Sequence, residues 1–281
     1  MSLDIKMHII EHDHLNQDIP ALLWQHEILV LRGLMVDVPT LISIGEAFGH
    51  VLENKATAND ANFAVDVEAK LLRVSNMRKD DKPAGLFGHN DLEWHNDFAH
   101  SPGEFHGTLL YNEFGGELAE TIFCDTRAAY QDLDQVIRDS LDKAIGYHRV
   151  TEKAYRRELS KAEQRLLKMT GWKPDNAEYS LACVHDTDTK RPLAPVHPVT
   201  GARAIYLAPA TYVGSDPLLS DDAYASLVKH CEQEKYIYTH RWQSGDVVIF
   251  DNLTTMHRRG AFNGDRTLWR MQFDYDKHLV R

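Results

Sequence analysis

Short apolar runs, many with alternating polar positions, recur along this chain. The run at 27–34 (EILVLRGL) ends at a glycine, and the segment at 266–276 alternates large apolar with polar residues. Runs of this length, rich in β-branched and aromatic residues, are typical of strands. The predicted strands are 27–34, one or two within 63–76, 104–114, 202–208, 236–242, 245–252 and 266–276.

Four other segments space their apolar residues at the helical period, and each starts at a residue that favours a helix N-terminus. They are 37–54, 125–144, 160–172 and 219–234, with Asp37, Asp125, Ser160 and Ser220 as the expected caps. Strands on both sides of a helical insertion at about 122–195 predict a mainly β protein, a sandwich or barrel. No repeat or linker divides the chain, so residues 1–281 are expected to form a single domain.

The composition and the net charge of the chain argue against several classes of function. The formal net charge of −11 argues against a nucleic-acid partner or an anionic membrane, since both require a basic face. No run approaches the roughly 18 apolar residues of a membrane span. The three cysteines, Cys124, Cys183 and Cys231, are dispersed, which is typical of a reducing compartment. We therefore expect a cytoplasmic protein.

The stretch EWHNDFAH at 93–100 is the first candidate for chemistry. It contains the triplet His95-Asn96-Asp97, but a chain with 16 histidines also produces such triplets by chance, and His89-Asn90-Asp91 is a second one. His257 follows the apolar strand at 245–252. Two histidines and one carboxylate would occupy one face of Fe(II) and leave three positions open. From the residues alone, any of the other histidines could serve as the distant ligand.

The predicted strand 266–276 carries a charged residue at its centre. Strand side chains alternate between two faces, so one face is apolar (Trp269, Met271, Phe273, Tyr275) and the other holds Arg266, Leu268, Arg270, Gln272 and Asp274. A guanidinium in mid-strand is costly to bury without an anion. The far carboxylate of a dicarboxylate would satisfy it through a bidentate pair. The alternative is an edge strand with its arginine in water.

Six blocks in a fixed order resemble the taurine/2,4-dichlorophenoxyacetate dioxygenase family. They are W-H-x-D at 94–97, GTLLYNEFGG, ETIFCDTRAAYQDL, HPVTGARAIYLA, HRWQSGDVVIFDNLTTMH and RTLWRMQF. The closing segment is also similar to the branch that forms isonitriles. The resemblance, from about residue 27 to 275, implies a double-stranded β-helix (a jelly roll, cupin-like) and dependence on Fe(II), 2-oxoglutarate and O2.

The resemblance also implies roles for individual residues. His95, Asp97 and His257 match the iron ligands, and Thr121 and Arg270 match the pair that binds the far carboxylate of 2-oxoglutarate. Trp94 before the triplet and Thr121 after it, 24 positions beyond Asp97, favour His95/Asp97 over His89/Asp91. Thirteen positions separate His257 from Arg270, fewer than is usual, so Arg266 on the same strand face is the alternative anchor.

The implied reaction hydroxylates or desaturates an unactivated C–H bond of a small organic substrate and releases succinate and CO2. A carboxylate at Asp97 argues against halogenation, because related halogenases lack it. Asp91 lies where some relatives contact the substrate, and an acid there would favour an amine; the alternative is a solvated acidic loop. Relatives of this kind often form dimers or tetramers, so a homo-oligomer is also expected.

Two rival functions remain from the sequence. One is a non-catalytic jelly-roll protein that binds a small molecule, and the other is a hydrolytic zinc protein that uses the same ligands. Other polar clusters are interpreted as structural: His12-Asp13-His14 as a solvated turn, His185-Asp186 as surface, His197-Pro198 as a turn, and Trp242 and Trp269 as core.

Overall fold

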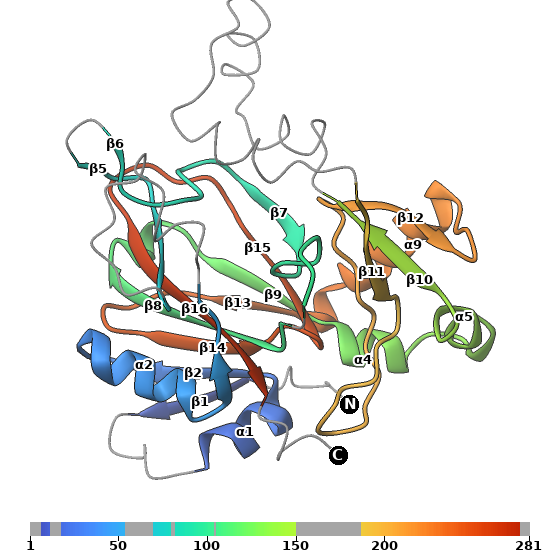
Figure 1. The fold of residues 1–281 in the computed structure, drawn as a ribbon, viewed down its shortest axis with the longest axis horizontal. Coiled ribbons are helices and arrows are strands. Elements are labelled where there is room, and N and C mark those ends of the chain that lie inside the picture. The colour runs from blue at the N-terminus through green and yellow to red at the C-terminus, as the bar shows by residue number, and fades with distance from the viewer. Residues whose placement is uncertain are drawn as a thin grey trace, which may run out of the picture.

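Two sheets face each other in the computed structural model, which describes residues 7–11, 18–53, 70–79, 82–103, 105–149 and 187–275 (Figure 1). The larger sheet has the order β1 (Met7–Glu11), β2 (Ile28–Arg32), β14 (Val247–Asp251), β8 (Gly107–Phe114), β16 (Thr267–Tyr275) and β3 (Gly49–Val51), with β4 (Leu72–Ser75) also paired to β16. The smaller sheet has the order β13 (Ile237–His240), β9 (Thr121–Asp125), β15 (Thr255–Arg259) and β7 (Leu92–His95). Except for β1 with β2, the pairs within both sheets are antiparallel.

Smaller elements surround these sheets. A three-stranded sheet has the order β11 (Thr189–Pro192), β10 (Ile145–His148) and β12 (Tyr212–Asp216), and β5 (Arg78–Lys79) pairs with β6 (Lys82–Pro83). The helices are α1 (Ile19–His26), α2 (Val38–Glu46), α4 (Thr126–Gln131), α5 (Gln135–Leu141) and α9 (Asp221–Cys231), with single turns η2 (Gly116–Leu118) and η3 (Glu234–Tyr236). The predicted mainly β architecture with helical additions is confirmed.

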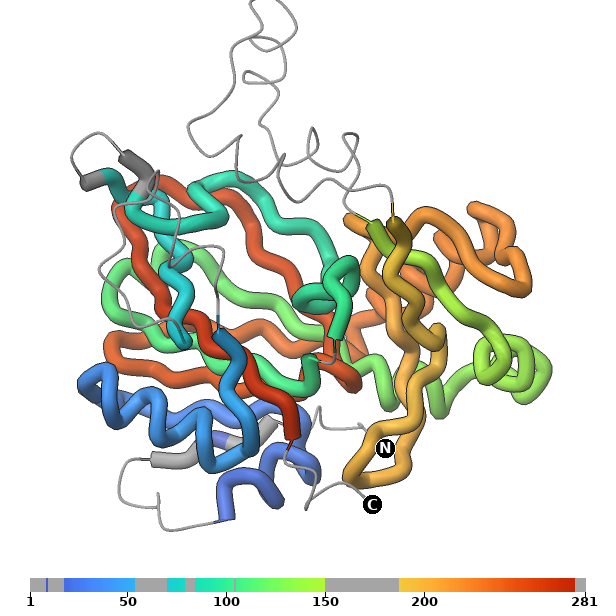
Figure 2. The backbone as a smooth tube through the Cα atoms, viewed as in Figure 1, coloured from blue at the N-terminus to red at the C-terminus, as the bar shows by residue number. Residues whose placement is uncertain are grey.

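Both faces of the larger sheet are buried, which explains why its central strands are continuously apolar. On β14, Val247 and Ile249 pack with the helices α1 and α2, whereas Val248 and Phe250 point toward the smaller sheet. On β16, the predicted apolar face is confirmed, because Trp269, Met271, Phe273 and Tyr275 all join the cluster under the helices. The last strand, β16, pairs in this sheet with β3 from the first fifth of the chain (Figure 2).

The smaller sheet separates the inter-sheet core from a third apolar layer. Cys124 of β9 and Met256 of β15 pack outward with residues of α4, α5 and α9, while Phe123 points inward. The next residue along β15 is His257, and strand alternation turns it toward the larger sheet. The fold therefore directs one histidine of this strand into the space between the sheets.

Three of the predicted helix starts are confirmed by their capping bonds. The carboxylates of Asp37 and Asp125 and the hydroxyl of Ser220 each accept a hydrogen bond from the backbone three residues on. The helix predicted at 125–144 is interrupted: α4 ends at Gln131, and the carboxylate of the next residue, Asp132, accepts from Lys235 and Tyr236. A new helix, α5, then starts after Asp134.

The strand predicted at 202–208 is wrong. This segment forms only the isolated bridge Val196–Arg203, although residues 204–208 are buried. Its backbone N–H groups are satisfied irregularly, since Ile205 donates to Thr126 and Tyr206 donates to Leu193. The segment therefore has the apolar composition of a buried strand without forming one.

Several sequence predictions lie outside the described residues: the helix at 160–172, His12-Asp13-His14 and His185-Asp186. Within the insertion expected at about 122–195, the described parts contain α4, α5, β10 and β11 in addition to most of β9. Trp242 and Trp269 are buried, as predicted. No helix in the described ranges combines the length and the apolar character that crossing a membrane requires.

The buried His148 on β10 leads to a testable prediction of how the free energy of unfolding depends on pH. Burial, together with the positive charges of Arg191 and His100, lowers its pKa to about 3. Below its ordinary pKa of roughly 6.5 the unfolded chain therefore binds a proton that the folded chain does not. The free energy of unfolding should therefore decrease as the pH is lowered from about 6.5 toward 3, by at most about 1.4 kcal/mol per pH unit.

We expect His148→Phe to reduce that pH dependence, since phenylalanine does not titrate and the site is lined by Tyr206 and Tyr212. Urea unfolding at pH 7 and pH 5 measures the effect as the difference between the two free energies of unfolding. An equal difference in wild type and variant would show that His148 does not titrate differently on folding.

Candidate metal centre

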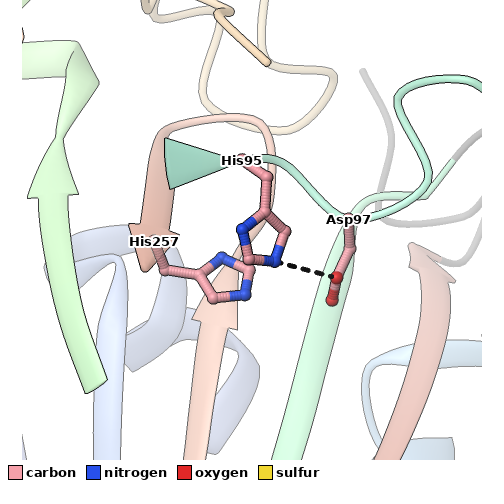
Figure 3. Close-up of side chains that lie close together, drawn as sticks. All are labelled: His95, Asp97 and His257. Atoms are coloured by element: carbon pink, nitrogen blue, oxygen red, sulfur yellow. Dashed lines mark ion pairs between the residues drawn. The ribbon is translucent and has the colours of Figure 1, made fainter. Parts of the chain in front are cut away.

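His95, Asp97 and His257 lie together between the two sheets (Figure 3). One potential ligand atom from each residue lies within 4.8 Å of the others. The histidine rings are 4.1 Å apart between centroids. Among the described residues, no other group of three such side chains meets this condition, and the rival pair His89/Asp91 does not join one.

Strand pairing brings the two histidines together. His257 on β15 lies opposite His95 at the end of β7 in the antiparallel register. The His257 ring packs against Phe123 and Phe250, with centroid distances of 5.9 and 4.7 Å. Asp97 follows β7 by two residues and lies in a turn. The cluster thus joins residues that are 160 positions apart in the chain.

Hydrogen bonds orient two members of the cluster. The Nδ1 of His95 lies 2.7 Å from the Glu93 carbonyl, so Nδ1–H donates and Nε2 is left to face Asp97 Oδ1 at 3.9 Å. Asp97 Oδ2 accepts from the Thr108 hydroxyl at 2.9 Å. Its Oδ1 accepts from Arg270 at 3.0 Å. Partners of this kind fix the tautomer and direction of metal ligands.

The electrostatics keep these groups in their metal-binding protonation states. Burial lowers the pKa of His257 to about 3, helped by the positive charge of a protonated His95, and burial also lowers the pKa of His95. Burial by itself would raise the pKa of Asp97, but Arg270 and the two histidines outweigh it and lower the pKa to about 2. At neutral pH the cluster therefore offers two neutral imidazoles and one carboxylate, the forms that bind a divalent cation.

The donor chemistry supplies a second sign that the cluster fits a cation. The donor set, two nitrogens and one carboxylate oxygen, matches the facial arrangement that suits Fe(II) and leaves coordination positions open.

Two further buried arginines lie near the β15–β16 connection. Arg266 is 2% exposed, and burial followed by repulsion from Arg259 lowers its pKa to about 9. Arg259 donates to the carbonyls of Phe87 and Asn90. The Phe262 ring lies 4.8 Å from the Arg259 guanidinium and 5.4 Å from that of Arg266. Neither arginine has a carboxylate partner within ion-pair distance in the described ranges, and the acids that favour their charged forms, Asp91 for Arg259 and Glu117 for Arg266, act from farther away.

Thr121 lies at the same end of the smaller sheet. It is opposite Arg259 in the β9–β15 register and is 3% exposed. Its hydroxyl oxygen accepts a hydrogen bond from Trp242 Nε1 at 3.0 Å. Because the oxygen acts as the acceptor there, the hydroxyl proton remains available to a further acceptor.

Arg270 lies next to the ligand cluster itself. Besides its bond to Asp97, its guanidinium lies over the rings of Phe87 and Phe98, at 5.3 and 5.1 Å from the centroids. Its Nε is buried without a partner among the described residues. Arg270 on β16 and Arg266, one residue before its start, therefore occupy different surroundings, although the sequence pattern places them on one face.

The predicted substrate residue, Asp91, is exposed, and its Oδ1 accepts from the backbone of Ala261 after β15. The sequence assigned no role to Thr108, Asn96 or Asn252: Thr108 and Asn252 bond Asp97, and Asn96 bonds Thr255. It also assigned none to Arg191, which donates to the carbonyls of Ala99, Ser101 and Gly103 just after Asp97. No local pattern marks these residues, because each acts through a contact distant in sequence.

Comparison with known sequences is consistent with this geometry. A sequence model of the taurine catabolism dioxygenase TauD, TfdA family matches residues 4–272. Pentalenolactone F synthase of Streptomyces arenae is 27% identical over 256 residues, which cover 84% of this chain and 78% of the relative. The alpha-ketoglutarate-dependent 2,4-dichlorophenoxyacetate dioxygenase of Burkholderia sp. (strain RASC) is 26% identical over 250 residues, covering 83% of this chain and 76% of the relative.

Comparison with solved structures supports the fold. AAD-2 in complex with Mn(II) and N-oxalylglycine matches with a TM-score of 0.65 at 19% identity, over 92% of this chain and 87% of that one. A taurine dioxygenase from Burkholderia xenovorans matches with the same TM-score and identity, over 92% of this chain and 80% of that one. The predicted double-stranded β-helix, or jelly roll, is confirmed by these likenesses.

Proposed function

This chain belongs to the taurine catabolism dioxygenase TauD, TfdA family, and on that basis we propose that His95, Asp97 and His257 hold the Fe(II) of a 2-oxoglutarate-dependent dioxygenase. The relatives make the chain an oxidoreductase that uses Fe(II), 2-oxoglutarate and O2. The observation that carries the ligand assignment is the convergence of three ligand atoms within 4.8 Å, from the buried Asp97 and His257 and the half-buried His95, in the protonation states that bind metal.

The bound metal and cosubstrate supply the oxidising power that hydroxylates or desaturates a C–H bond and releases succinate and CO2. The protein's residues contribute placement and shielding. Thr108 and Arg270 hold the two oxygens of Asp97, and the Glu93 carbonyl holds the His95 ring. Phe123 and Phe250 pack against His257 and support a dry, apolar surrounding for the reaction.

The far carboxylate of 2-oxoglutarate is better matched by Arg266 than by Arg270, which the sequence favoured. Arg270 already bonds a proposed metal ligand, whereas Arg266 is buried and forms no ion pair with any described residue. Arg266 lies one residue before β16 and four positions from Arg270, or roughly 13 Å along an extended chain. Two methylene groups separate the far carboxylate of 2-oxoglutarate from the end that binds the metal. The arginine that binds this carboxylate should therefore lie farther from the metal than residues that contact the metal ligands. We therefore propose Arg266 with Thr121 as the anchor.

With Arg266 as the anchor for 2-oxoglutarate, Arg270 is available to bind the substrate. Its guanidinium lies between two phenyl rings with its Nε unpartnered, which favours an organic acid with an apolar body. The relative from Burkholderia is named for such an acid, 2,4-dichlorophenoxyacetate. The amine expected from Asp91 is the competing substrate class, and Asp91 already has one oxygen bonded to the backbone of Ala261.

One experiment separates the proposed enzyme from its rivals. The protein is purified without metal, and succinate formation is measured with Fe(II), with Zn(II) and without metal, across a 2-oxoglutarate titration and a panel of organic acids and amines. We expect succinate only with Fe(II), 2-oxoglutarate and O2. Binding of a small molecule without metal dependence would indicate a non-catalytic binding protein, and turnover with Zn(II) but no 2-oxoglutarate would indicate a hydrolase.

Three proposals come from the sequence alone: a cytoplasmic location, a single domain over residues 1–281 and a homo-oligomer. Size-exclusion chromatography with light scattering tests the proposed homo-oligomer.

A further inference from the structure

The side chain of Asn252 bonds both main-chain groups of Asp97. Asn252 Oδ1 accepts from the Asp97 N–H at 2.8 Å, and Asn252 Nδ2 donates to the Asp97 carbonyl at 3.1 Å. The same Nδ2 donates to the carbonyl of Phe105 at 3.1 Å. Asn252 is 1% exposed and Asp97 is 3% exposed, so water does not compete for these bonds.

A second asparagine bonds the same two segments, and here the side chain comes from the Asp97 turn and the backbone groups from the β14–β15 turn and the start of β15. Asn96 Nδ2 donates to the carbonyls of Asn252 and Thr255, both at 2.8 Å. Asn252 also donates its own backbone N–H to His106 at 2.8 Å. The turn between β14 and β15, which ends three residues before His257, is therefore bonded to the turn that carries Asp97.

These bonds take the place of strand pairing at Asp97, which lies just beyond the end of β7. β7 ends at His95, and Asp97 lies in the following turn, where no strand pairs with it. Its buried N–H and carbonyl need partners, and a carboxamide presents a donor and an acceptor side by side, as a neighbouring peptide group would.

We propose that Asn252 is a positioning residue that fixes the spacing between the metal ligands Asp97 and His257. The inference rests on the proposed function, because it assumes that these residues bind the metal. Partners that orient ligands without touching the metal typically change metal affinity by about 10- to 100-fold. We expect Asn252→Ala to weaken divalent-metal binding within this range, since the Asp97 turn loses its fixed distance from β15.

Asn112 offers a matched control on β8. It is also a fully buried asparagine that bonds main chain on both sides, accepting from Gly116 at 3.0 Å and donating to Gln243 at 2.8 Å. It lies four residues beyond Thr108, or roughly 13 Å along the strand from the residue that bonds Asp97. Asn112→Ala should therefore lower the melting temperature without changing metal affinity.

The experiment titrates the full-length, metal-free protein with Co(II) and follows the visible absorbance of the bound ion, with melting temperatures measured in parallel. Wild type, Asn252→Ala, Asn252→Asp, Asn112→Ala and His257→Ala are compared. Asn252→Asp keeps the acceptor for the Asp97 N–H but turns an oxygen toward two carbonyls, so it tests the donor even if the alanine variant does not fold.

Weaker Co(II) binding in both Asn252 variants, with wild-type affinity in Asn112→Ala, would support the inference. Wild-type Co(II) affinity in a folded Asn252 variant, or an equal loss in Asn112→Ala, would overturn it. If wild type fails to bind Co(II), or His257→Ala binds it equally well, the proposed metal centre fails instead. The two failures are therefore distinguishable.

Discussion

Replacing His257 with alanine is expected to abolish measurable Fe(II)-dependent conversion of 2-oxoglutarate to succinate. His257 supplies one of only three protein ligand atoms in the cluster. Loss of a residue that merely orients a ligand already costs about 10- to 100-fold, so the loss of a ligand should exceed about 100-fold in metal affinity and in turnover. Isothermal titration with Mn(II) and a succinate assay measure the two effects.

His148→Ala is the matched control, because His148 is equally a buried histidine but packs against Tyr206 and Tyr212 on β10. It should lose stability and keep its Mn(II) affinity. The ligand assignment would be contradicted if His257→Ala bound Mn(II) like wild type, or if the control lost affinity to the same degree. Asp97→Ala should repeat the His257 result, since its carboxylate is the only acid in the cluster.

Replacing Arg266 with methionine is expected to raise the KM for 2-oxoglutarate far more than the same change at Arg270. Truncating one partner of a buried, hydrogen-bonded charge pair costs about 2–5 kcal/mol, which corresponds to roughly 30- to 5,000-fold in affinity. Arg266 is 2% exposed and has no acid partner of its own within the described ranges, so an anionic ligand is the group that would compensate its charge.

Arg270→Met should instead weaken metal binding and substrate use, because Arg270 bonds Asp97 and lies beside the ligand cluster. Steady-state kinetics at saturating metal, with 2-oxoglutarate and substrate varied separately, distinguish the two effects. If Arg270→Met raised the KM for 2-oxoglutarate and Arg266→Met left it unchanged, the anchor would be Arg270, the residue that the sequence first indicated.

Local structure was the most predictable part of this protein. Asp37, Asp125 and Ser220 cap helices through bonds to the third residue beyond them, so the whole interaction is contained in four consecutive residues. The two faces of β16 likewise follow from alternation alone. Prediction was wrong at 202–208, where a buried apolar run has the composition of a strand but finds no ladder partner.

Ordered motifs and local periodicity are enough to predict the family, the fold class and the residue types that could hold a metal. Which histidine lies opposite His95 depends on the register between β7 and β15, which arises only when the strands pair. Tertiary structure also separates the surroundings of Arg266 and Arg270, which share one strand face in the sequence. Burial and charge compensation arise from contacts between segments as far apart as Asp97 and Arg270, and no local pattern encodes those contacts.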